Sequence, residues 1–449
     1  MIHDHDTIVA PATATGGAIA VIRISGTDTF AVCDRIFRGQ AALAETAGYT
    51  VRYGRIVDGT RTIDDVLATV FRAPHSYTGE DAVEIACHGS SYIVGETLRL
   101  LIAAGARMAD PGEFTVRAFL AGKMDLAQAE AVADLIASST EASHALASNQ
   151  MRGGYSSALG ELRGELLHLA SLLELELDFS EEEVEFADRD RLRETMRRIA
   201  GRIDRLRESF RLGNALKEGV AVAIAGAPNV GKSTLLNRLL NDDRALVSDI
   251  AGTTRDVIEE SCVIEGIRFR FLDTAGIRAT DDRLERMGIE RTLTSIARAR
   301  IVIRMVDAAS LDGSPLAAPD FEIRGDQTLL TVVNKLDAAP TAPLPPDAIG
   351  ISAKLGEGIS ALREALCRAV DASPLRRGDT IVSNSRHYEA LTAAAEALEN
   401  ALRGLSEGLP TDLLSEEIRL VTHHLGTITG QITTDQILGN IFSKFCIGK

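Results

Sequence analysis

Tryptophan is absent from this chain of 449 residues, and aromatic residues make up only 4% of it. Cysteine is also scarce: the five cysteines lie far apart and form no CxxC pair, which argues against a zinc site or a disulfide framework. No apolar run approaches the roughly 20 residues that span a bilayer, and the opening MIHDHDTI does not resemble a signal peptide. We therefore expect a cytoplasmic protein with no membrane segment.

Positive charge is in short supply. The chain carries 48 lysines and arginines against 64 aspartates and glutamates, a formal net charge of −16. Non-specific affinity for nucleic acid comes mostly from lysine and arginine that neutralise phosphates, so this balance argues against a general nucleic-acid binder. Only residues 196–207 and 207–217 are notably basic, and both are predicted to form the charged face of a long helix. An RNA ligand would need such a local patch or the surface of a partner protein.

The most informative motif that is present is GAPNVGKS at residues 226–233, which fits the phosphate-binding P-loop and follows the apolar, strand-like run VAVAIA. Gly226 and Gly231 allow backbone N–H groups to surround the α- and β-phosphates, while Lys232 reaches the β- and γ-phosphates. Ser233 is predicted to bind Mg2+, and the positive end of the following helix favours the anion. Alone, this motif is moderate evidence for a nucleotide site.

Three further strings follow in the order of a GTPase domain: DTAG at 273–276, NKLD at 334–337 and SAK at 352–354. Each ends a strand-like run, so each is expected at the carboxyl edge of a parallel sheet, where such folds bind ligands. The carboxylate of Asp337 can accept two hydrogen bonds from the N1–H and N2–H2 groups of guanine, which adenine lacks. The strings therefore predict a site for GTP rather than ATP.

Another loop, SDIAGTTRD at residues 248–256, lies between the P-loop and DTAG and offers Thr254 as a second Mg2+ ligand. Arg255, in the same loop, is as consistent with a surface position as with catalysis. The predicted GTP contacts are Gly226, Asn229, Val230, Gly231, Lys232, Ser233, Thr234, Ser248, Asp249, Ile250, Ala251, Gly252, Thr253, Thr254, Asp273, Thr274, Ala275, Gly276, Asn334, Lys335, Asp337, Ser352, Ala353 and Lys354.

Hydrolysis needs a group that positions water and a positive charge against the charge that develops on the γ-phosphate. Many GTPases place a glutamine after DTAG, but here that position is Ile277, whose side chain cannot orient water. The candidates downstream are acidic, and such residues are also typical of a solvated helix face. They are Asp281, Asp282, Glu285 and Glu290.

The length of the chain predicts about three domains at ~150 residues each. Residues 1–121 mix short β-like runs with helical segments that are expected only near their end, which indicates an α+β domain. Residues 122–216 and 377–449 show long amphipathic helical patterns. Between them lies an α/β P-loop GTPase domain at 217–376, which ends in a linker, SPLRRGD. The simplest arrangement that buries every helical stripe is one helical domain with the GTPase domain inserted into it.

The motifs together resemble one family, the tRNA modification GTPases MnmE, also called TrmE. The similarity extends over essentially the whole chain, from the opening DTIVAPAT through GGAIAVIRISG and SYTGEDAVEI to the last residues, FCIGK. A P-loop and DTAG are shared by all GTPases, whereas the terminal CIGK and the GTTRD loop are much more specific. The resemblance implies a potassium-stimulated GTPase that takes part in modifying the wobble uridine of certain tRNAs.

The resemblance also implies roles for particular residues of the GTPase domain. A potassium ion takes the place of an arginine finger and is bound by Asn229, Ser248, Thr253 and the backbone of Ile250. Ser248 departs from the threonine expected there, a small change where only an oxygen is needed. Oxygen ligands such as the asparagine side-chain carbonyl suit this cation. The implied catalytic acid, which orients water indirectly, is Glu285.

For the first domain, the resemblance implies a homodimer interface and a site for a folate that carries a one-carbon unit, 5-formyl- or 5,10-methylene-tetrahydrofolate. The matching positions are Arg23, Glu80, Lys123 and the last residue, Lys449. A carboxylate suits the donor and acceptor edge of a pterin, and a cation suits its glutamate tail. The resemblance implies a flavin-containing partner, MnmG, as well, which this chain cannot replace because it carries no GxGxxG fingerprint.

Two other interpretations stay open. One is a GTP-switched assembly factor of the ribosome-biogenesis type, which the acidic balance and the FCIGK tail disfavour. The other is a folate-binding enzyme with a regulatory GTPase module. His75 and His88 stand alone and are expected to be packed or exposed, and Cys446 is either a reactive thiol or a residue that packs the tail.

Overall fold

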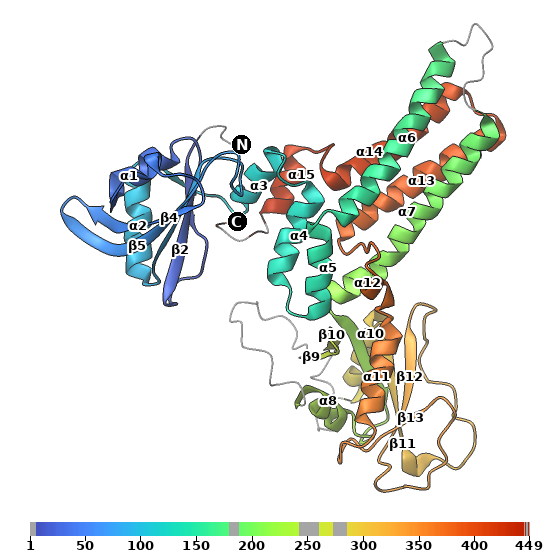
Figure 1. Ribbon diagram of the computed structural model, residues 1–449. Coiled ribbons are helices and arrows are strands. Elements are labelled where there is room, and N and C mark those ends of the chain that lie inside the picture. The colour runs from blue at the N-terminus through green and yellow to red at the C-terminus, as the bar shows by residue number, and fades with distance from the viewer. Residues whose placement is uncertain are drawn as a thin grey trace. The chain divides into compact units, whose positions relative to one another are not determined.

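The computed structural model describes residues 6–178, 188–241, 260–272 and 285–443, together with Phe445 and Gly448. Contacts divide the chain into two compact units: Met1–Ala133 with Thr422–Lys449, and Asp134–Val421. The two ends of the chain therefore belong to one unit (Figure 1). The sequence pattern assigned the whole of residues 377–449 to the helical domain, whereas their contacts group the last 28 residues, 422–449, with the N-terminal unit.

The first unit is built on a sheet whose strand order, within the described part of the chain, is β3-β4-β5-β6-β2-β1-β7. Neighbouring strands are antiparallel, except that β1 and β7 are parallel. Alternate residues of β5, such as Val66, Ala68 and Val70, are buried, as expected for a strand with one face on a core. The strands are Ile8–Pro11 (β1), Ile19–Ser25 (β2), Phe37–Gly39 (β3), Thr50–Asp58 (β4), Arg61–Phe71 (β5), Ala82–His88 (β6) and Arg107–Met108 (β7).

Two helices, α1 (Thr29–Ile36) and α2 (Ser91–Ala103), lie between these strands in the sequence. The expectation that helical segments occur only near the end of the first domain is therefore wrong. Both helices pack against the sheet, and their buried residues, among them Cys33 and Leu101, join one core with strand residues such as Ile22. Helix α2 contains several β-branched residues, which favour strands locally, and its burial against the sheet overrides that preference.

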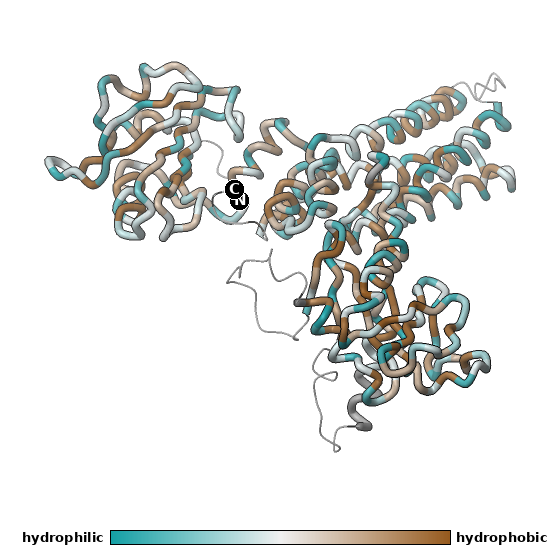
Figure 2. The backbone as a smooth tube through the Cα atoms, turned by 60° about the horizontal axis from the view of Figure 1, so that its bottom comes forward, coloured by the Kyte–Doolittle hydropathy of each residue, from teal (hydrophilic) through white to brown (hydrophobic). Residues whose placement is uncertain are grey.

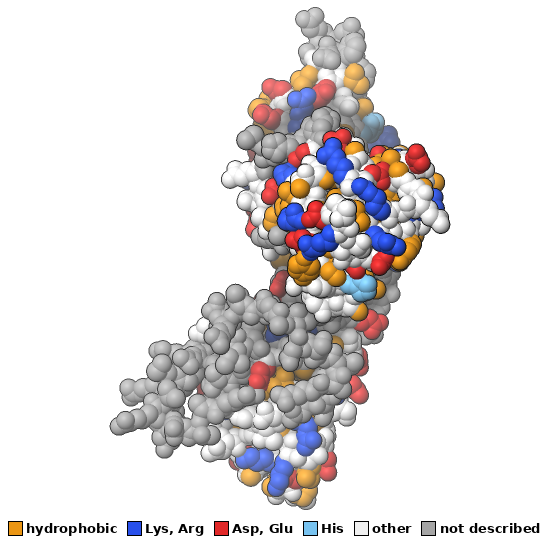
Figure 3. Space-filling model, turned by 90° about the vertical axis from the view of Figure 1, so that its left-hand side faces the viewer, with side chains coloured by type: hydrophobic (Ala, Val, Ile, Leu, Met, Phe, Trp, Pro, Cys, Tyr) orange, Lys and Arg blue, Asp and Glu red, His pale blue; other side chains and the backbone are white. Residues whose placement is uncertain are grey.

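A smaller core in the same unit joins residues that are far apart in the sequence. It packs α3 (Glu113–Leu120) and the beginning of α4 (Leu126–Ala137) against α15 (Asp435–Phe442) through side chains such as Val116 and Phe442. On the face of this unit that Figure 3 shows, basic and acidic side chains are interspersed. The charges on that face therefore largely compensate one another.

The second unit contains the long helices that the pattern predicted (Figure 1). Helix α7 packs against α13, and ion pairs join Glu165 of α6 to Arg198 and Arg202 of α7, each at 2.9 Å. The stretch predicted to be a linker contains a short helix, α12, which is a correction to that prediction. These helices are α5 (Glu141–Met151), α6 (Gly154–Asp178), α7 (Arg189–Glu218), α12 (Ser373–Arg377), α13 (Ser385–Glu407) and α14 (Thr411–Thr429).

The GTPase part of this unit lies in the sequence between α7 and α12. Its sheet has the strand order β13-β12-β11-β8-β10-β9 in the described residues, with β9 antiparallel to β10 and the other pairs parallel. Hydrophobic residues run along these strands in Figure 2, as expected for a sheet buried on both faces. The elements are β8 (Val220–Gly226), α8 (Lys232–Asn241), β9 (Glu260–Ile264), β10 (Ile267–Phe271), α10 (Glu285–Arg298), β11 (Ile301–Asp307), β12 (Thr328–Asn334), β13 (Ile349–Gly350) and α11 (Ile359–Val370).

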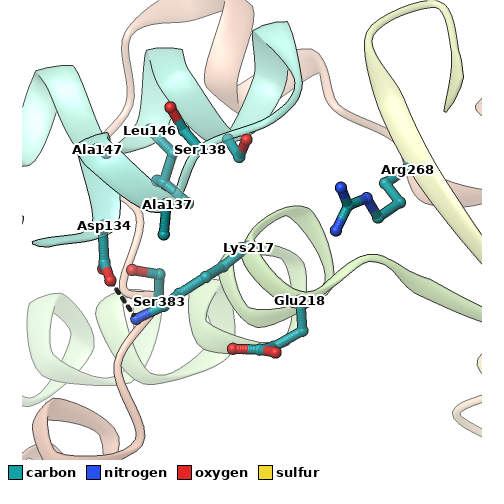
Figure 4. Close-up of a pocket in the computed structure, with 10 residues that line it drawn as sticks. Asp134, Ala137, Ser138, Leu146, Ala147, Lys217, Glu218, Arg268 and Ser383 are labelled. Carbon is teal, nitrogen blue, oxygen red and sulfur yellow. Dashed lines mark ion pairs between the residues drawn. The ribbon is translucent and has the colours of Figure 1, made fainter. Parts of the chain in front are cut away.

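A small cavity of about 210 Å³ lies where α7 leads into β8. Lys217, near the end of α7, forms an ion pair with Asp134 of α4, with 2.8 Å between Nζ and Oδ1 (Figure 4). Arg268 of β10 also lines this cavity, and its guanidinium donates a hydrogen bond to the hydroxyl of Ser139. The bond from Arg268 thus attaches the GTPase sheet to the connection between α4 and α5, which precedes it in the sequence.

Candidate functional site

The P-loop follows β8 at the carboxyl edge of the parallel sheet, as predicted. Gly226 has φ +152°, and a Cβ there would lie 2.5 Å from the carbonyl oxygen of Met305. Gly231 has φ +104°, and a Cβ there would lie 2.2 Å from Nδ2 of Asn334. Both positions therefore require glycine, for backbone conformation and for space. Asn229 also has a left-handed backbone, with φ 59°.

Lys232 begins α8, and its side chain lies over the loop that precedes it. Its Nζ donates hydrogen bonds to the carbonyl oxygens of Gly226, at 2.8 Å, and Ala227, at 2.9 Å. Burial lowers the pKa of Lys232 from its ordinary value. Ser233 and Thr234 follow in the first turn of α8, where backbone N–H groups favour an anion. The loop, the lysine and the helix start thus form a site suited to phosphates.

Asn334 connects the P-loop to the SAK segment. It ends β12 and is only 3% exposed. Its Nδ2 donates to the carbonyl oxygen of Val230 at 2.8 Å, and its Oδ1 accepts from the backbone N–H of Ala353 at 2.9 Å. The side chain of Asn334, in the NKLD motif, thereby joins the P-loop to the SAK segment, although these two motifs lie more than 100 residues apart in the sequence.

Lys335 follows with a left-handed backbone, φ 67°. Its Nζ forms an ion pair with Asp307 at 2.7 Å, and the hydrogen bond from Lys335 lowers the pKa of Asp307. The sequence analysis missed Asp307. It could have been found, because it ends the apolar run IVIRMV and therefore lies at the same edge of the sheet as the other motifs.

Asp337 is positioned by Ser352. The hydroxyl of Ser352, a fully buried residue, donates to Oδ1 of Asp337 at 2.7 Å and accepts from the backbone N–H of Leu355 at 3.2 Å. The carbonyl oxygen of Lys354 accepts from Arg238 of α8 at 2.8 Å, a second contact that the sequence analysis missed. The structure thus brings together the residues predicted to read guanine and those predicted to bind phosphates.

Several predicted site residues lie outside the described part of the chain. Glu285 is the first residue of helix α10, but the side chain of Glu285 is not described. The others are Ser248, Asp249, Ile250, Ala251, Gly252, Thr253, Thr254, Arg255, Asp273, Thr274, Ala275, Gly276, Ile277, Asp281, Asp282, Cys446 and Lys449.

In the N-terminal unit, Arg23 lies on β2 opposite Glu84 of β6. Its guanidinium pairs with Glu84, with 2.8 Å between Nη2 and Oε1, and donates to the carbonyl oxygen of Gly448 at 3.3 Å. The guanidinium carbon also lies 5.4 Å from the centre of the Tyr77 ring and 5.7 Å from that of Phe114. The penultimate residue of the chain and Arg23 are therefore in direct contact.

Glu80 lies next to the same group of residues. Its Oε2 accepts a hydrogen bond from the hydroxyl of Ser25 at 2.7 Å, and its Oε1 pairs with Arg117 at 3.1 Å. Lys123 donates to the carbonyl oxygen of Pro74, in the loop that leads to Glu80. Arg23 and Lys123 thus each contact residues of the loop that contains Glu80.

Arg117 is a further charged residue that the sequence analysis missed. Its side chain is only 6% exposed and forms ion pairs with Asp6, Glu80 and Glu113. Burial disfavours its charge, but the neighbouring carboxylates outweigh burial and raise the pKa of Arg117. An arginine among the mostly apolar residues FTVRAFL of α3, four residues after Glu113, was the available signal.

Among the described residues, the isolated histidines and cysteines show no catalytic arrangement. His88 contacts Asp64, with 2.7 Å between Nδ1 and Oδ1. Cys33 and Cys87 are buried, and burial raises the pKa of the Cys87 thiol to about 11. The described residues contain no group of histidines, cysteines and carboxylates able to bind a metal ion. None of the described helices is long and apolar enough to cross a membrane.

Comparison with known proteins covers both units. A model of the GTP-binding protein TrmE N-terminus matches residues 7–123, and a model of the MnmE helical domain matches residues 126–446. The chain is 52% identical over 460 residues to the tRNA modification GTPase MnmE of Parabacteroides distasonis, covering 99% of this chain and 100% of that protein. The chain belongs to the MnmE family. A second member, from Christiangramia forsetii, is 49% identical over 471 residues and covers 99% of each chain.

Membership of the MnmE family makes this chain a GTPase that takes part in tRNA modification. It also confirms the predicted fold class: an N-terminal α+β domain, a helical domain and a P-loop GTPase domain. Among solved structures, Era bound to MgGDPNP and a segment of 16S ribosomal RNA is 29% identical over 39% of this chain and 65% of that chain. The TM-score of 0.26 is too low to relate the two architectures.

Proposed function

We propose that this chain is a potassium-stimulated GTPase whose nucleotide cycle rearranges a homodimer. With MnmG it adds a carboxymethylaminomethyl group to C5 of the wobble uridine of certain tRNAs. The one-carbon donor is 5-formyl- or 5,10-methylene-tetrahydrofolate. The observation that carries the proposal is the side chain of Asn334, which joins the P-loop to the segment that positions Asp337. Family membership over the full chain supports the link to tRNA.

Two cations are assigned to the phosphate site. Asn229 is proposed as a potassium ligand, because a left-handed backbone at this position of the P-loop suits close approach to a bound nucleotide. Ser248, Thr253 and the backbone of Ile250 complete this proposed site, while Ser233 and Thr254 are proposed for Mg2+. When bound, the cations neutralise negative charge that develops on the transferring phosphoryl group. The residues supply the oxygen donors that these ions prefer.

Glu285 is proposed to orient the attacking water indirectly, because Ile277 cannot do so. This role predicts that Glu285→Ala lowers kcat and leaves nucleotide affinity largely unchanged, since such a group acts in the transition state. If Glu285→Ala kept the kcat of the parent, Asp281, Asp282 or Glu290 would have to orient the water instead.

The N-terminal unit is proposed to bind the folate through Arg23, Glu80, Lys123 and Lys449. The fit rests on their chemistry: Arg23 lies beside the partly exposed ring of Tyr77, which can contact a flat pterin ring, and Glu80 supplies a carboxylate for the polar edge of the pterin. When bound, the folate supplies a one-carbon unit. Because Arg23 contacts Gly448 directly, the chain terminus is well placed to contribute to the same site.

The test is nucleoside analysis of tRNA from a strain that lacks the gene, with and without the gene restored. We expect the side chain at C5 of the wobble uridine to be lost and then recovered. Unchanged nucleosides would contradict the proposal, and immature ribosomal RNA in the same strain would favour an assembly factor instead. Restoring an Asp337→Asn variant serves as the control that nucleotide binding is needed.

A further inference from the structure

An open cavity of about 790 Å³ lies at the edge of the GTPase sheet opposite the P-loop. It is lined where strands begin: Gly219 and Ala221 at the start of β8, and Arg300 just before β11. The nucleotide site follows the carboxyl ends of the same strands. The cavity is therefore separate from the GTP site, and its volume is within the range of small-ligand pockets.

Six arginines line this space, and we call it the arginine cavity. Its only acidic lining residues in the described chain are Glu208 and Asp326, so the lining carries a formal excess of positive charge. The whole chain, in contrast, has a net charge of −16. The arginines are Arg207, Arg211, Arg270, Arg298, Arg300 and Arg324.

The protein compensates this positive charge only in part. Asp326 is shared by two guanidinium groups, at 3.1 Å from Arg324 and 3.8 Å from Arg211. Arg298 is exposed and has no carboxylate partner among the residues that the structure describes. Arg300 donates to the carbonyl oxygen of Arg211 at 2.7 Å, and burial together with the nearby Arg211 charge lowers the pKa of Arg300. Arg207 pairs with Asp204 of α7 at 2.9 Å. The formal positive charge that remains in the lining can attract an anion.

The other basic stretch of α7, residues 196–207, provides a contrast. Two of its arginines pair with carboxylates of α6: Arg198 pairs with Glu165, and Arg202 pairs with both Glu161 and Glu165. This stretch is the charged helix face that the sequence predicted. The stretch at 207–217 instead supplies Arg207 and Arg211 to the cavity.

Aromatic side chains lie beside the arginines. Phe210 of α7 stacks on Tyr388 of α13, with ring centres 4.6 Å apart and planes at 22°. Both line the cavity, and Tyr388 is 36% exposed. Guanidinium groups bind phosphates through paired hydrogen bonds, and an exposed aromatic ring stacks on an unpaired base. Arginine with an adjoining aromatic face is the combination that single-stranded or looped RNA requires.

We propose that the arginine cavity binds the phosphate backbone of RNA, with Tyr388 contacting a neighbouring base. This inference rests on the proposed function, because tRNA is the RNA which that function supplies. The cavity then explains how a chain with a net charge of −16 can bind tRNA. The tRNA contacts one local basic patch, and the net negative charge of the chain disfavours non-specific nucleic acid.

The test compares two double variants of the full chain that remove equal charge. Arg211→Ala/Arg298→Ala removes cavity arginines, and Arg197→Ala/Arg205→Ala removes exposed arginines of α7 outside the cavity. Binding of tRNA is measured by fluorescence anisotropy over a range of salt concentrations. We expect the cavity variant to weaken binding about tenfold or more and to reduce the slope of log affinity against log salt by roughly 1.4–1.8, about 0.7–0.9 for each lost phosphate contact. The control variant should change little.

GTP turnover of both variants should match the parent, which confirms that the variants are folded. If Arg211→Ala/Arg298→Ala does not fold, Arg211→Gln/Arg298→Gln tests the same charge with side chains closer in size. Equal losses in the cavity and control variants, or no loss in the cavity variant, would overturn the site and leave the proposed function intact. A parent chain that binds no tRNA at any salt concentration would overturn the site, whereas the proposed function is overturned only by unchanged nucleosides in the strain that lacks the gene.

Tyr388→Ala separates RNA from other polyanions. We expect several-fold weaker binding of tRNA and unchanged binding of inorganic polyphosphate, which has no base to stack. Equal effects on both ligands, or no effect on either, would contradict the assignment to RNA.

Discussion

Nδ2 of Asn334 donates a hydrogen bond to the carbonyl oxygen of Val230, at 2.8 Å. Val230 is in the P-loop and Asn334 is in the segment that leads to Asp337, the residue predicted to read guanine, so this bond joins the predicted phosphate and base ends of the site. Gly231 makes the contact sterically acceptable, because any Cβ at that position would overlap Asn334. Asn334 is therefore an organising residue as well as a predicted nucleotide contact.

Asn334→Ala should reduce both stability and GTP affinity. It removes the partners of two buried backbone groups, the carbonyl of Val230 and the N–H of Ala353, and each unpaired group costs about 1–3 kcal/mol. Urea unfolding and GTP titration measure the two effects. Asn400→Ala, at an exposed position on α13, is the control and should change stability by no more than about 0.5 kcal/mol. Parental affinity in Asn334→Ala would show that the bridge does not organise the site.

Asp337→Asn should change the preferred base. An amide cannot accept both guanine N–H bonds, but it can pair with a xanthine base, so hydrolysis should shift from GTP towards XTP. Competing GTP and XTP turnover measures the preference. Ser352→Ala is the matched control: it removes only the hydroxyl that positions Asp337, and should weaken GTP binding without a gain for XTP. An unchanged preference in Asp337→Asn would place guanine recognition elsewhere.

Arg23→Ala and Glu80→Ala should weaken binding of 5-formyl-tetrahydrofolate by about tenfold or more, since hydrogen bonds to charged groups are worth about 1.5–3 kcal/mol each. Isothermal calorimetry measures the affinity, and GTP turnover should stay at the parental rate. Arg55→Ala is the control, because Arg55 belongs to the same sheet but is 62% exposed. Unchanged folate affinity in both variants, and in a chain without Lys449, would remove the one-carbon role.

The N-terminal unit should lose stability in acid through Glu113. Burial opposes its ionisation, but hydrogen bonds from Arg107, the Asp110 N–H and Arg117 outweigh burial and lower its pKa below the ordinary 4.5. The unfolded chain therefore takes up the proton first, so the stabilisation is fully present above pH 4.5 and is lost as the pH falls through the lower folded value.

Hydrogen exchange of amides in β1 and α3, between about pH 6 and pH 3, measures this loss. Glu113→Gln should be less stable near neutral pH and show a flatter pH profile. Glu96→Gln, which breaks an exposed pair with Arg99, should keep the parental profile. If the stability of Glu113→Gln changed with pH in the same way as that of the parent, Glu113 would not be the group responsible for the loss in acid.

Motifs of the GTPase domain could be predicted because their chemistry fixes both residue type and local context. Gly226, Lys232 and Asn334 lie where strand ends were expected. Asp307 escaped notice because a single carboxylate has no signature without its partner, Lys335, which only the parallel pairing of β11 and β12 brings near. Arg117 was missed for a similar reason: two of its three carboxylate partners, Asp6 and Glu80, come from other segments, and only Glu113 lies in the same helix.

Helical patterns show that a face is buried but not what buries it. The residues of α15 were therefore assigned to the helical domain, whereas Leu438 and Phe442 pack against Val116 and Leu126 of the N-terminal unit. The short helices α1 and α2 were missed because their β-branched residues resemble strands until tertiary contacts are known. The arginine cavity likewise combines residues from α7, β8, β10, α10, α13 and the segments before β11 and β12, which no single stretch of sequence reveals.

The most direct test of the central claim is GTP turnover by the full chain in potassium chloride and in sodium chloride at equal ionic strength. The account predicts a marked acceleration by potassium and little by sodium. Asn229→Ala should abolish the potassium response while much of the nucleotide affinity remains, because that affinity depends on the backbone loop and Lys232. Equal rates in the two salts would contradict the account of hydrolysis.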